Sequence, residues 1–344
     1  MDKEHLNEWL KKRKERRESL TSSNLFEGIK KHPNSSLSSA ITLLESSLDQ
    51  DQAIAKELVK QCIPLSGKSI RIGITGVPGV GKSTFIESFG EVLLKENKKI
   101  AVLAIDPSSE ISGGSILGDK TRMESLTQAE NVFIRPSPAG KSLGGVAQKT
   151  RESIILCEAA GYDVIIIETV GVGQSSTMVH SMVDFFLLLM LSGAGDELQG
   201  IKRGIMEMAD SIAITKADGD TLQKAKLASQ EYKNALHLFP ANENDWIPKS
   251  YVCSSYTGLN INKTWEIIQS FYNSTTLNGW FQKRRDKQDE FWFYETLKDI
   301  VYRNFFNNIS NQEEIEKYLE LITNKKISSI QAAEALFVST IKSK

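Results

Sequence analysis

The sequence predicts an α/β fold: a mostly parallel sheet covered by helices, with helical segments added at both ends of the chain. From about residue 70, short and continuously apolar runs alternate with helical stretches, a pattern typical of strands that are buried on both faces. The residues before this region, and those after about residue 279, instead have apolar residues at helical spacing. The expected parts are an N-terminal helical extension (1–65), an α/β domain (66–278) and a C-terminal helical arm (279–344).

The N-terminal extension is expected to be helical. Residues 6–20 are rich in strong helix formers, and residues 35–62 have apolar residues at helical spacing. The basic run from Lys11 to Arg17 would suit nucleic acid or an acidic partner, but a solvated helix face is the better interpretation. The whole chain has 42 basic and 43 acidic residues, so it has no strongly positive field, and we expect no nucleic-acid partner.

Composition and patterning favour a soluble, cytoplasmic protein with no membrane partner. The most apolar segment, residues 182–191, has about half of the roughly 20 residues that a membrane helix needs, and Asp184 interrupts it. The start of the chain is charged and lacks the apolar stretch of a signal peptide. The three cysteines lie far apart and the four histidines are scattered, which predicts no structural zinc site and fits a reducing compartment.

Seven apolar runs are the predicted strands of the α/β domain, and helical patterns separate them. They lie at residues 71–75, 99–106, 132–136, 163–168, 184–191, 211–215 and 250–254. No comparable run follows residue 279, where charged and aromatic residues alternate at helical spacing. The many aromatic residues of this helical tail need a surface to pack against. That surface could lie within the same chain or on a second copy of it.

Residues 76–83 have the sequence G-V-P-G-V-G-K-S, which fits the phosphate-binding pattern G-x-x-x-x-G-K-[ST]. The motif follows an apolar run and opens a helical stretch. Its glycines let several backbone N–H groups point at one phosphate chain, and the helix N-terminus adds partial positive charge. We expect Lys82 to reach the β- and γ-phosphates and the Ser83 hydroxyl to bind Mg²⁺. The predicted nucleotide-binding residues of this loop are Gly76, Val77, Pro78, Gly79, Val80, Gly81, Lys82, Ser83 and Thr84.

The segment T-K-A-D at residues 215–218 indicates that the base is guanine. It follows a predicted strand and resembles the N-K-x-D motif of GTPases, in which one carboxylate accepts hydrogen bonds from the N1–H and the 2-amine of guanine. Adenine lacks both donors, so Asp218 would be left unpaired. Thr215 stands where Asn is usual, and its hydroxyl can make one tie to the loop but not both bonds of an amide. The stem of Lys216 can cover the base, and a further guanine contact is expected from Ser254, Ser255 and Tyr256.

Two other segments could sense the γ-phosphate. Glu168 ends a predicted strand and could hold Mg²⁺ directly or through water, while the Gly171 amide could bond the γ-phosphate. Gln174 could position the attacking water. Asp106 ends another strand, and Asp119 follows in the next loop, where a solvated surface acid is an open alternative. The predicted metal ligands are Ser83, Asp106, Asp119 and Glu168.

The succession of motifs resembles the MeaB type of methylmalonyl-CoA mutase-associated GTPases, members of which have also been labelled arginine/ornithine transport ATPases. The similar segments lie within residues 35–310 and include GITGVPGVGKST, AIDPSS, GGSILGDKTRM, RPSPAGKSLGGVAQKTRE, ETVGVGQS, DFFLLLMLSGAGDELQGIKRGIMEMAD and TKADGD. The resemblance implies a P-loop GTPase core that uses Mg²⁺ with GTP or GDP, and a C-terminal arm that forms a homodimer. It also implies a chaperone of an adenosylcobalamin-dependent acyl-CoA mutase, which gates cofactor loading and protects or reactivates the mutase.

The resemblance further implies that residues 192–202, SGAGDELQGIK, couple contact with the mutase to hydrolysis. Asp196 and Lys202 match the charged residues of that family segment, and Lys202 could supply positive charge to the transition state. The alternative is that both are surface charges of a loop. Residues 175–182, SSTMVHSM, depart from the family, where an acidic residue is common. The expected catalytic residues are Lys82, Glu168, Gln174, Asp196 and Lys202.

Two rival classes stay open. A nickel-insertion GTPase usually has His or Cys ligands near its switch segments, and Cys157 and His180 make no plausible cluster in this sequence. A transport-associated ATPase or kinase would have no need of Asp218. Within the favoured class, the mutase served could act on methylmalonyl-CoA or on isobutyryl-CoA.

Overall fold

The computed structural model describes residues 20–105, 123–136, 143–169, 173–193, 203–240, 243–306 and 309–342. The chain divides into two compact units after Gln288. The first unit contains the sheet, its covering helices and the N-terminal helices. The second contains the C-terminal helices.

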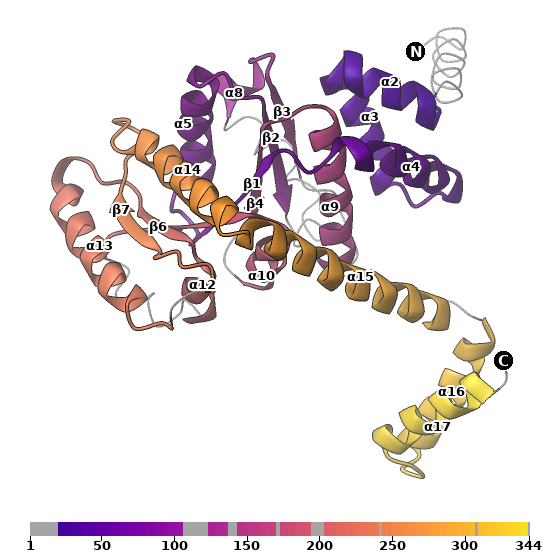
Figure 1. The fold of residues 1–344 in the computed structure, drawn as a ribbon. Helices are drawn as coiled ribbons and strands as arrows, with labels where there is room; N and C mark the ends of the chain where they lie inside the picture. The colour runs from indigo at the N-terminus through magenta and orange to yellow at the C-terminus, as the bar shows by residue number, and fades with distance from the viewer. Residues whose placement is uncertain are drawn as a thin grey trace, which may run out of the picture. The chain divides into compact units, whose positions relative to one another are not determined.

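The first unit is built on a seven-stranded sheet in the order β3-β2-β4-β1-β5-β6-β7, and every neighbouring pair is parallel (Figure 1). The strands are β1 (Ile70–Gly76), β2 (Ile100–Ile105), β3 (Val132–Arg135), β4 (Val164–Thr169), β5 (Phe185–Met190), β6 (Ser211–Ile214) and β7 (Lys249–Val252). All seven predicted strands and the α/β class are therefore confirmed. Since β1 lies between β4 and β5, the chain order reverses beside it, which is where open α/β sheets bind ligands.

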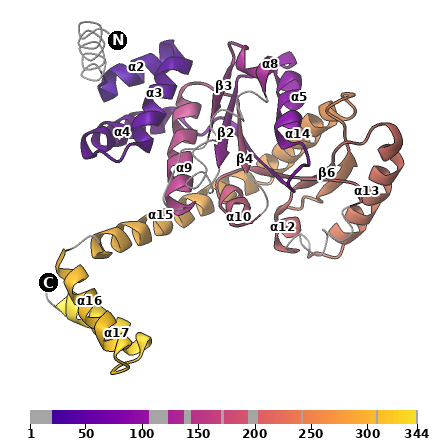
Figure 2. The same cartoon turned by 180° about the vertical axis from the view of Figure 1, so that it is seen from behind.

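Helices cover both faces of the sheet (Figures 1 and 2). On one face α9 (Leu143–Ala159) and α10 (Gln174–His180) contact each other and pack on the central strands. On the other, α5 (Lys82–Lys95) contacts α14 (Ile261–Leu277), whose Phe271 ring meets Phe185 of β5. Helix α13 (Leu222–Leu236) packs on β6 and β7. The short elements described in this part include α8 (Glu124–Thr127), α12 (Arg203–Met208) and the 3₁₀ turn η2 (Gly219–Thr221).

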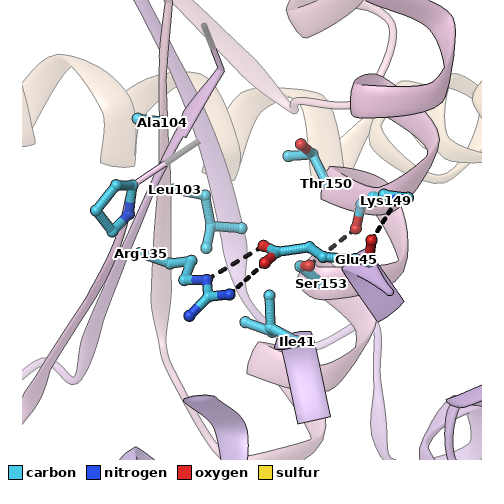
Figure 3. A pocket seen from close by; sticks show the side chains of 9 residues that line it. Ile41, Glu45, Leu103, Ala104, Arg135, Lys149, Thr150 and Ser153 are labelled. Carbon is cyan, nitrogen blue, oxygen red and sulfur yellow. Dashed lines mark hydrogen bonds and ion pairs between the residues drawn. The ribbon is translucent and has the colours of Figure 1, made fainter. Parts of the chain in front are cut away.

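The N-terminal extension consists of α2 (Ser22–Lys31), α3 (Pro33–Glu45), α4 (Asp49–Cys62) and the 3₁₀ turn η1 (Ile63–Leu65), and the three α-helices pack on one another and on α9. The structure thus divides the expected helical stretch 35–62 into two helices. Glu45, which ends α3, forms an ion pair with Arg135 at the end of β3, and Lys149 of α9 donates to the Glu45 carbonyl at 2.7 Å (Figure 3). The extension is therefore tied to the sheet as well as to α9.

A buried ion pair fixes the first turns of α15 (Trp280–Phe306) to the amino edge of the sheet. The Arg285 guanidinium donates to both carboxylate oxygens of Asp184, at 2.9 and 2.7 Å, and to the carbonyls of Gly67 and Ser69, at 2.6 and 2.7 Å. Gln288 donates to the Val183 carbonyl at 2.8 Å. Every bond of this network lies within the first unit.

The second unit contains the rest of α15, together with α16 (Ile309–Thr323) and α17 (Ser329–Lys342), which pack against each other. Many of its large apolar side chains are exposed, including Phe293, Tyr294, Ile300, Val301, Tyr302 and Phe337. Across the described parts of both units, no helix combines the length and the apolar character needed to cross a bilayer.

Candidate active site

The phosphate-binding loop joins β1 to α5 at the carboxyl edge of the sheet. Its glycines are required for two different structural reasons, backbone conformation and space. Gly79 and Gly81 have φ angles of +75° and +87°, which a residue with a Cβ atom adopts only under strain. Gly76 is needed for space, because a Cβ there would lie 2.6 Å from the Leu189 carbonyl oxygen of β5. The loop is thus held tightly against the neighbouring strand.

Lys82 lies at the first position of α5 and folds back over the loop. Its Nζ donates to the carbonyl oxygens of Gly76 at 2.9 Å and Val77 at 3.5 Å. Burial lowers the pKa of Lys82, and the negative charge of Glu168 opposes that shift. The Lys82 ammonium group therefore lies against the loop, where it would contact a phosphate chain bound there.

Ser83 and Glu168, two predicted metal ligands, are brought together from different elements. Ser83 Oγ donates to Glu168 Oε1 at 3.4 Å. A hydroxyl and a carboxylate are the hard oxygen ligands that Mg²⁺ accepts, and this ion usually keeps further water or phosphate ligands. The described residues contain no group of three His, Cys, Asp or Glu side chains able to hold a metal ion. The Ser83 hydroxyl and the Glu168 carboxylate therefore fit Mg²⁺ whose other ligands come from phosphate and water.

The predicted base-binding segment is tied to the phosphate-binding loop through two side chains. Thr215, buried at the end of β6, donates to the Val80 carbonyl at 2.8 Å. Lys216 has a φ of +54°, and its Nζ donates to the Gly79 carbonyl at 2.8 Å. The bond expected of the Thr215 hydroxyl is thus made to the phosphate-binding loop, and the same hydroxyl also lies 3.3 Å from the Met190 carbonyl oxygen at the end of β5.

The Asp218 carboxylate is oriented by the loop that follows β7. The buried Ser254 hydroxyl donates to Asp218 Oδ2, and the Thr257 amide donates to Ser254 Oγ at 3.2 Å. The carbonyl of Ser255 accepts a bond from the Ser88 hydroxyl of α5 at 3.2 Å. Tyr256 is 92 % exposed. Of the three residues expected beside the guanine, Ser254 therefore contacts the Asp218 carboxylate directly, and Ser255 ties this loop to α5.

Some predicted site residues cannot be placed. Asp106, Asp119, Gly171, Asp196 and Lys202 lie outside the described residues, and Gln174 is described only as the first residue of α10, without its side chain. Their assigned roles stay predictions.

Several hydroxyl groups that organise the candidate site were not predicted from the sequence. Thr221 donates to the Asp218 carbonyl at 2.7 Å and to the Lys216 carbonyl. Thr75, Thr169 and Ser176 form a buried chain behind the phosphate-binding loop. Serine and threonine are common in any sequence, and the only signal for these residues was their position beside the motifs.

Comparisons with known proteins agree on one family. The family model described as "Methylmalonyl Co-A mutase-associated GTPase MeaB" matches residues 37–310. A "Putative GTPase" of Caulobacter vibrioides is 52 % identical over 263 residues, which cover 76 % of this chain and 80 % of the relative. "GTPase ArgK" of Escherichia coli is 44 % identical over 290 residues, covering 84 % and 86 %. A solved structure described as "LAO/AO transport system kinase" superposes with a TM-score of 0.74 at 35 % identity, covering 93 % of this chain and 97 % of the other.

Proposed function

The chain belongs to the MeaB family of methylmalonyl-CoA mutase-associated GTPases and is itself a GTPase, and we propose that it is a chaperone of an adenosylcobalamin-dependent acyl-CoA mutase. In this role GTP binding and hydrolysis gate the loading of the cofactor, and they protect or reactivate the mutase. The observation that carries the nucleotide part of the proposal is the tie of Thr215 and Lys216 to the phosphate-binding loop. It joins the predicted phosphate and base subsites into one unit.

The triphosphate would lie along the backbone amides of residues 76–84, with Lys82 at its β- and γ-phosphates. Asp218 would accept the two guanine hydrogen bonds. The bond that the Ser254 hydroxyl donates to Asp218 Oδ2 supports this role, because it holds the carboxylate in one orientation. Catalysis in this class is mostly positioning and charge neutralisation. The folded phosphate-binding loop would position the phosphates, and the Lys82 ammonium group held against it would neutralise their charge.

Mg²⁺ would be held by Ser83 and Glu168, whose side chains meet at 3.4 Å, with Asp106 and Asp119 as further proposed ligands. When bound, the ion neutralises phosphate charge. The Gly171 amide would bond the γ-phosphate, and Gln174 would position the attacking water. Asp196 and Lys202 would respond to contact with the mutase.

The C-terminal unit would form a homodimer. Its support is the large number of exposed apolar side chains on α15 and α17, such as Val301 at 58 % and Phe337 at 57 % exposure, since apolar surface gathered on one segment commonly marks an interface. A light-scattering mass of the full chain tests this directly, and a monomer at micromolar concentration would contradict it. A cytoplasmic location stays a prediction from the sequence.

The chaperone role is tested by GTP turnover with and without a purified acyl-CoA mutase. We expect an increase of roughly ten-fold or more with the cognate mutase, as for GTPases completed by a partner, and none with an unrelated protein at equal concentration. Running methylmalonyl-CoA and isobutyryl-CoA mutases side by side identifies the partner. An unchanged rate with a mutase that demonstrably binds the chain would contradict the chaperone role and leave the GTPase activity standing.

The nickel-insertion alternative has less support. Cys157 is fully buried, and burial raises the pKa of its thiol, which keeps it from acting as a thiolate ligand. A nickel titration that left the protein's spectrum and melting temperature unchanged would dispose of it. A comparison of GTP with ATP as the bound nucleotide separates the transport ATPase or kinase alternative from the GTPase.

A further inference from the structure

Three buried hydroxyl groups form a chain of hydrogen bonds behind the phosphate-binding loop. The Thr169 hydroxyl donates to Thr75 Oγ1 at 2.8 Å, and the Thr75 and Ser176 hydroxyl oxygens lie 2.9 Å apart. All three residues are fully buried. A buried hydroxyl is costly unless it is paired, so the packing of this region depends on the chain being complete.

Each member of this hydroxyl chain stands beside a part of the proposed site. Thr75 immediately precedes Gly76, the first residue of the phosphate-binding loop, and Thr169 immediately follows Glu168. Ser176 lies in the first turn of α10. Strands β1 and β4 are parallel neighbours with Ile74 paired to Glu168, so the next residue of each strand brings its hydroxyl to the other.

The hydroxyl chain crosses from the sheet to α10 where the two pack closely. Gly73 lies two residues before Thr75 and so on the same face of β1, and a Cβ atom there would be 2.8 Å from Val179 Cγ1 of α10. On the helix side, the Gly173 amide donates to Ser176 Oγ at 3.4 Å. Ser176 therefore shares its oxygen between a strand end and the turn that starts α10, and loss of one member disturbs the bonds of the others.

We propose that Thr75, Thr169 and Ser176 are positioning residues for GTP hydrolysis, which fix the Glu168 carboxylate and the start of α10 relative to the phosphate-binding loop. The inference rests on the proposed role of Glu168, whose Oε1 already accepts a bond from Ser83 Oγ at 3.4 Å. Thr169 is its immediate neighbour, so any shift of this strand end moves the carboxylate. Misplacement by about 1 Å can cost roughly 100-fold in rate, so two bonds of ordinary strength can control turnover.

None of the three side chains is expected to touch the nucleotide, and this separates a positioning role from a binding role. Turnover should fall while affinity for the nucleotide holds. The valine variant Thr75→Val keeps the shape of threonine and removes the hydroxyl, whereas Thr75→Ser keeps the hydroxyl and removes a methyl group. Ser176→Ala removes one oxygen and adds nothing.

The test measures kcat and KM for GTP and the Kd for GDP on the full chain without mutase. We expect Thr75→Val and Ser176→Ala each to lower kcat by about 10-fold with KM and Kd within about 3-fold of the wild type, and Thr75→Ser to restore kcat to within about 3-fold. The double variant Thr75→Val with Ser176→Ala should lose less kcat than the product of the two single effects, because the bond between these two hydroxyl groups is already lost in either single variant.

Three outcomes would overturn the inference: wild-type kcat in both single variants, Thr75→Ser as slow as Thr75→Val, or kcat and GDP affinity falling together with the melting temperature. If Thr75→Val does not fold, Ser176→Ala decides alone by the same criteria. Glu168→Gln separates this inference from the proposed site. If Glu168→Gln slows turnover and the hydroxyl variants do not, only the positioning role is refuted. If Glu168→Gln leaves turnover unchanged, the proposed role of Glu168 itself is refuted.

Discussion

The Thr215 hydroxyl donates to the Val80 carbonyl oxygen at 2.8 Å, so this buried side chain ties the end of β6 to the phosphate-binding loop. Removing it in Thr215→Val leaves a buried carbonyl with one partner fewer, which costs about 1 kcal/mol. We therefore expect the Kd for GDP, measured by calorimetry, to rise roughly 5-fold. Thr215→Ser keeps the hydroxyl and should bind as the wild type does. Equal affinity in Thr215→Val and Thr215→Ser would show that this bond does not order the pocket.

Lys82 is the cation placed inside the phosphate-binding loop, with its Nζ 2.9 Å from the Gly76 carbonyl. Lys82→Ala removes a preorganised charge from the site, and we expect kcat for GTP hydrolysis to fall at least about 100-fold. Lys95, exposed at the other end of the same helix, supplies the matched control, because Lys95→Ala removes the same charge at a distance. A phosphate-release assay that finds wild-type turnover in Lys82→Ala would refute the phosphate subsite.

Arg285 and Asp184 form a buried bidentate pair, with side chains 8 % and 2 % exposed. Arg285→Ala leaves the Asp184 carboxylate buried without its counter-ion, and we expect the free energy of unfolding in urea to fall by about 3–5 kcal/mol. The control is Arg303→Ala, which breaks an exposed pair with Asp299 further along α15 and should cost less than about 1 kcal/mol. Similar losses in both variants would contradict the importance assigned to the buried network.

His180 should make the protein less stable in acid. Burial, with a smaller contribution from the Arg284 charge, lowers the pKa of His180 from 6.5 to about 3. Between pH 6.5 and about 3, His180 therefore binds a proton in the unfolded chain but not in the folded chain. The contribution of His180 to stability is present above pH 6.5 and is lost as the pH falls. Relative to His180→Phe, which keeps an aromatic ring beside Phe186, the wild type should lose about 2 kcal/mol between pH 6.5 and 4.5.

The neighbouring Asp210 acts in the opposite direction. Burial raises its pKa to about 6, so its contribution falls as the pH rises from about 4 to 6. Because Asp210 is present in both proteins, the difference between their urea-unfolding curves isolates His180. A flat difference across this pH range would show that His180 titrates normally in the folded protein.

The strands could be predicted from the sequence because burial on both faces leaves an unbroken apolar run. Runs such as 163–168 and 184–191 correspond to β4 and β5, in which every residue is buried. The division of the helical stretch 35–62 into two helices was harder to predict. Its apolar spacing does not reveal the break after Glu45, where the Ser46 hydroxyl donates to Asp51 at 2.7 Å and turns the chain into α4.

The motifs of the candidate site could be recognised from the sequence where their residues are close together, as in residues 76–84 and 215–218. Contacts between distant residues could not be. Thr75 and Ser176 meet across 101 positions, and Arg135 and Glu45 across 90. Nothing in the local sequence of a single serine or arginine shows which partner the fold will bring to it.

A guanine nucleotide is proposed to lie between the phosphate-binding loop and Asp218, and calorimetry with non-hydrolysable GTP and ATP analogues in Mg²⁺ measures this binding. We expect a clear isotherm with the GTP analogue, affinity for the ATP analogue weaker by roughly 100-fold or more, and loss of this preference in Asp218→Ala. Binding of the ATP analogue with no heat from the GTP analogue would contradict it.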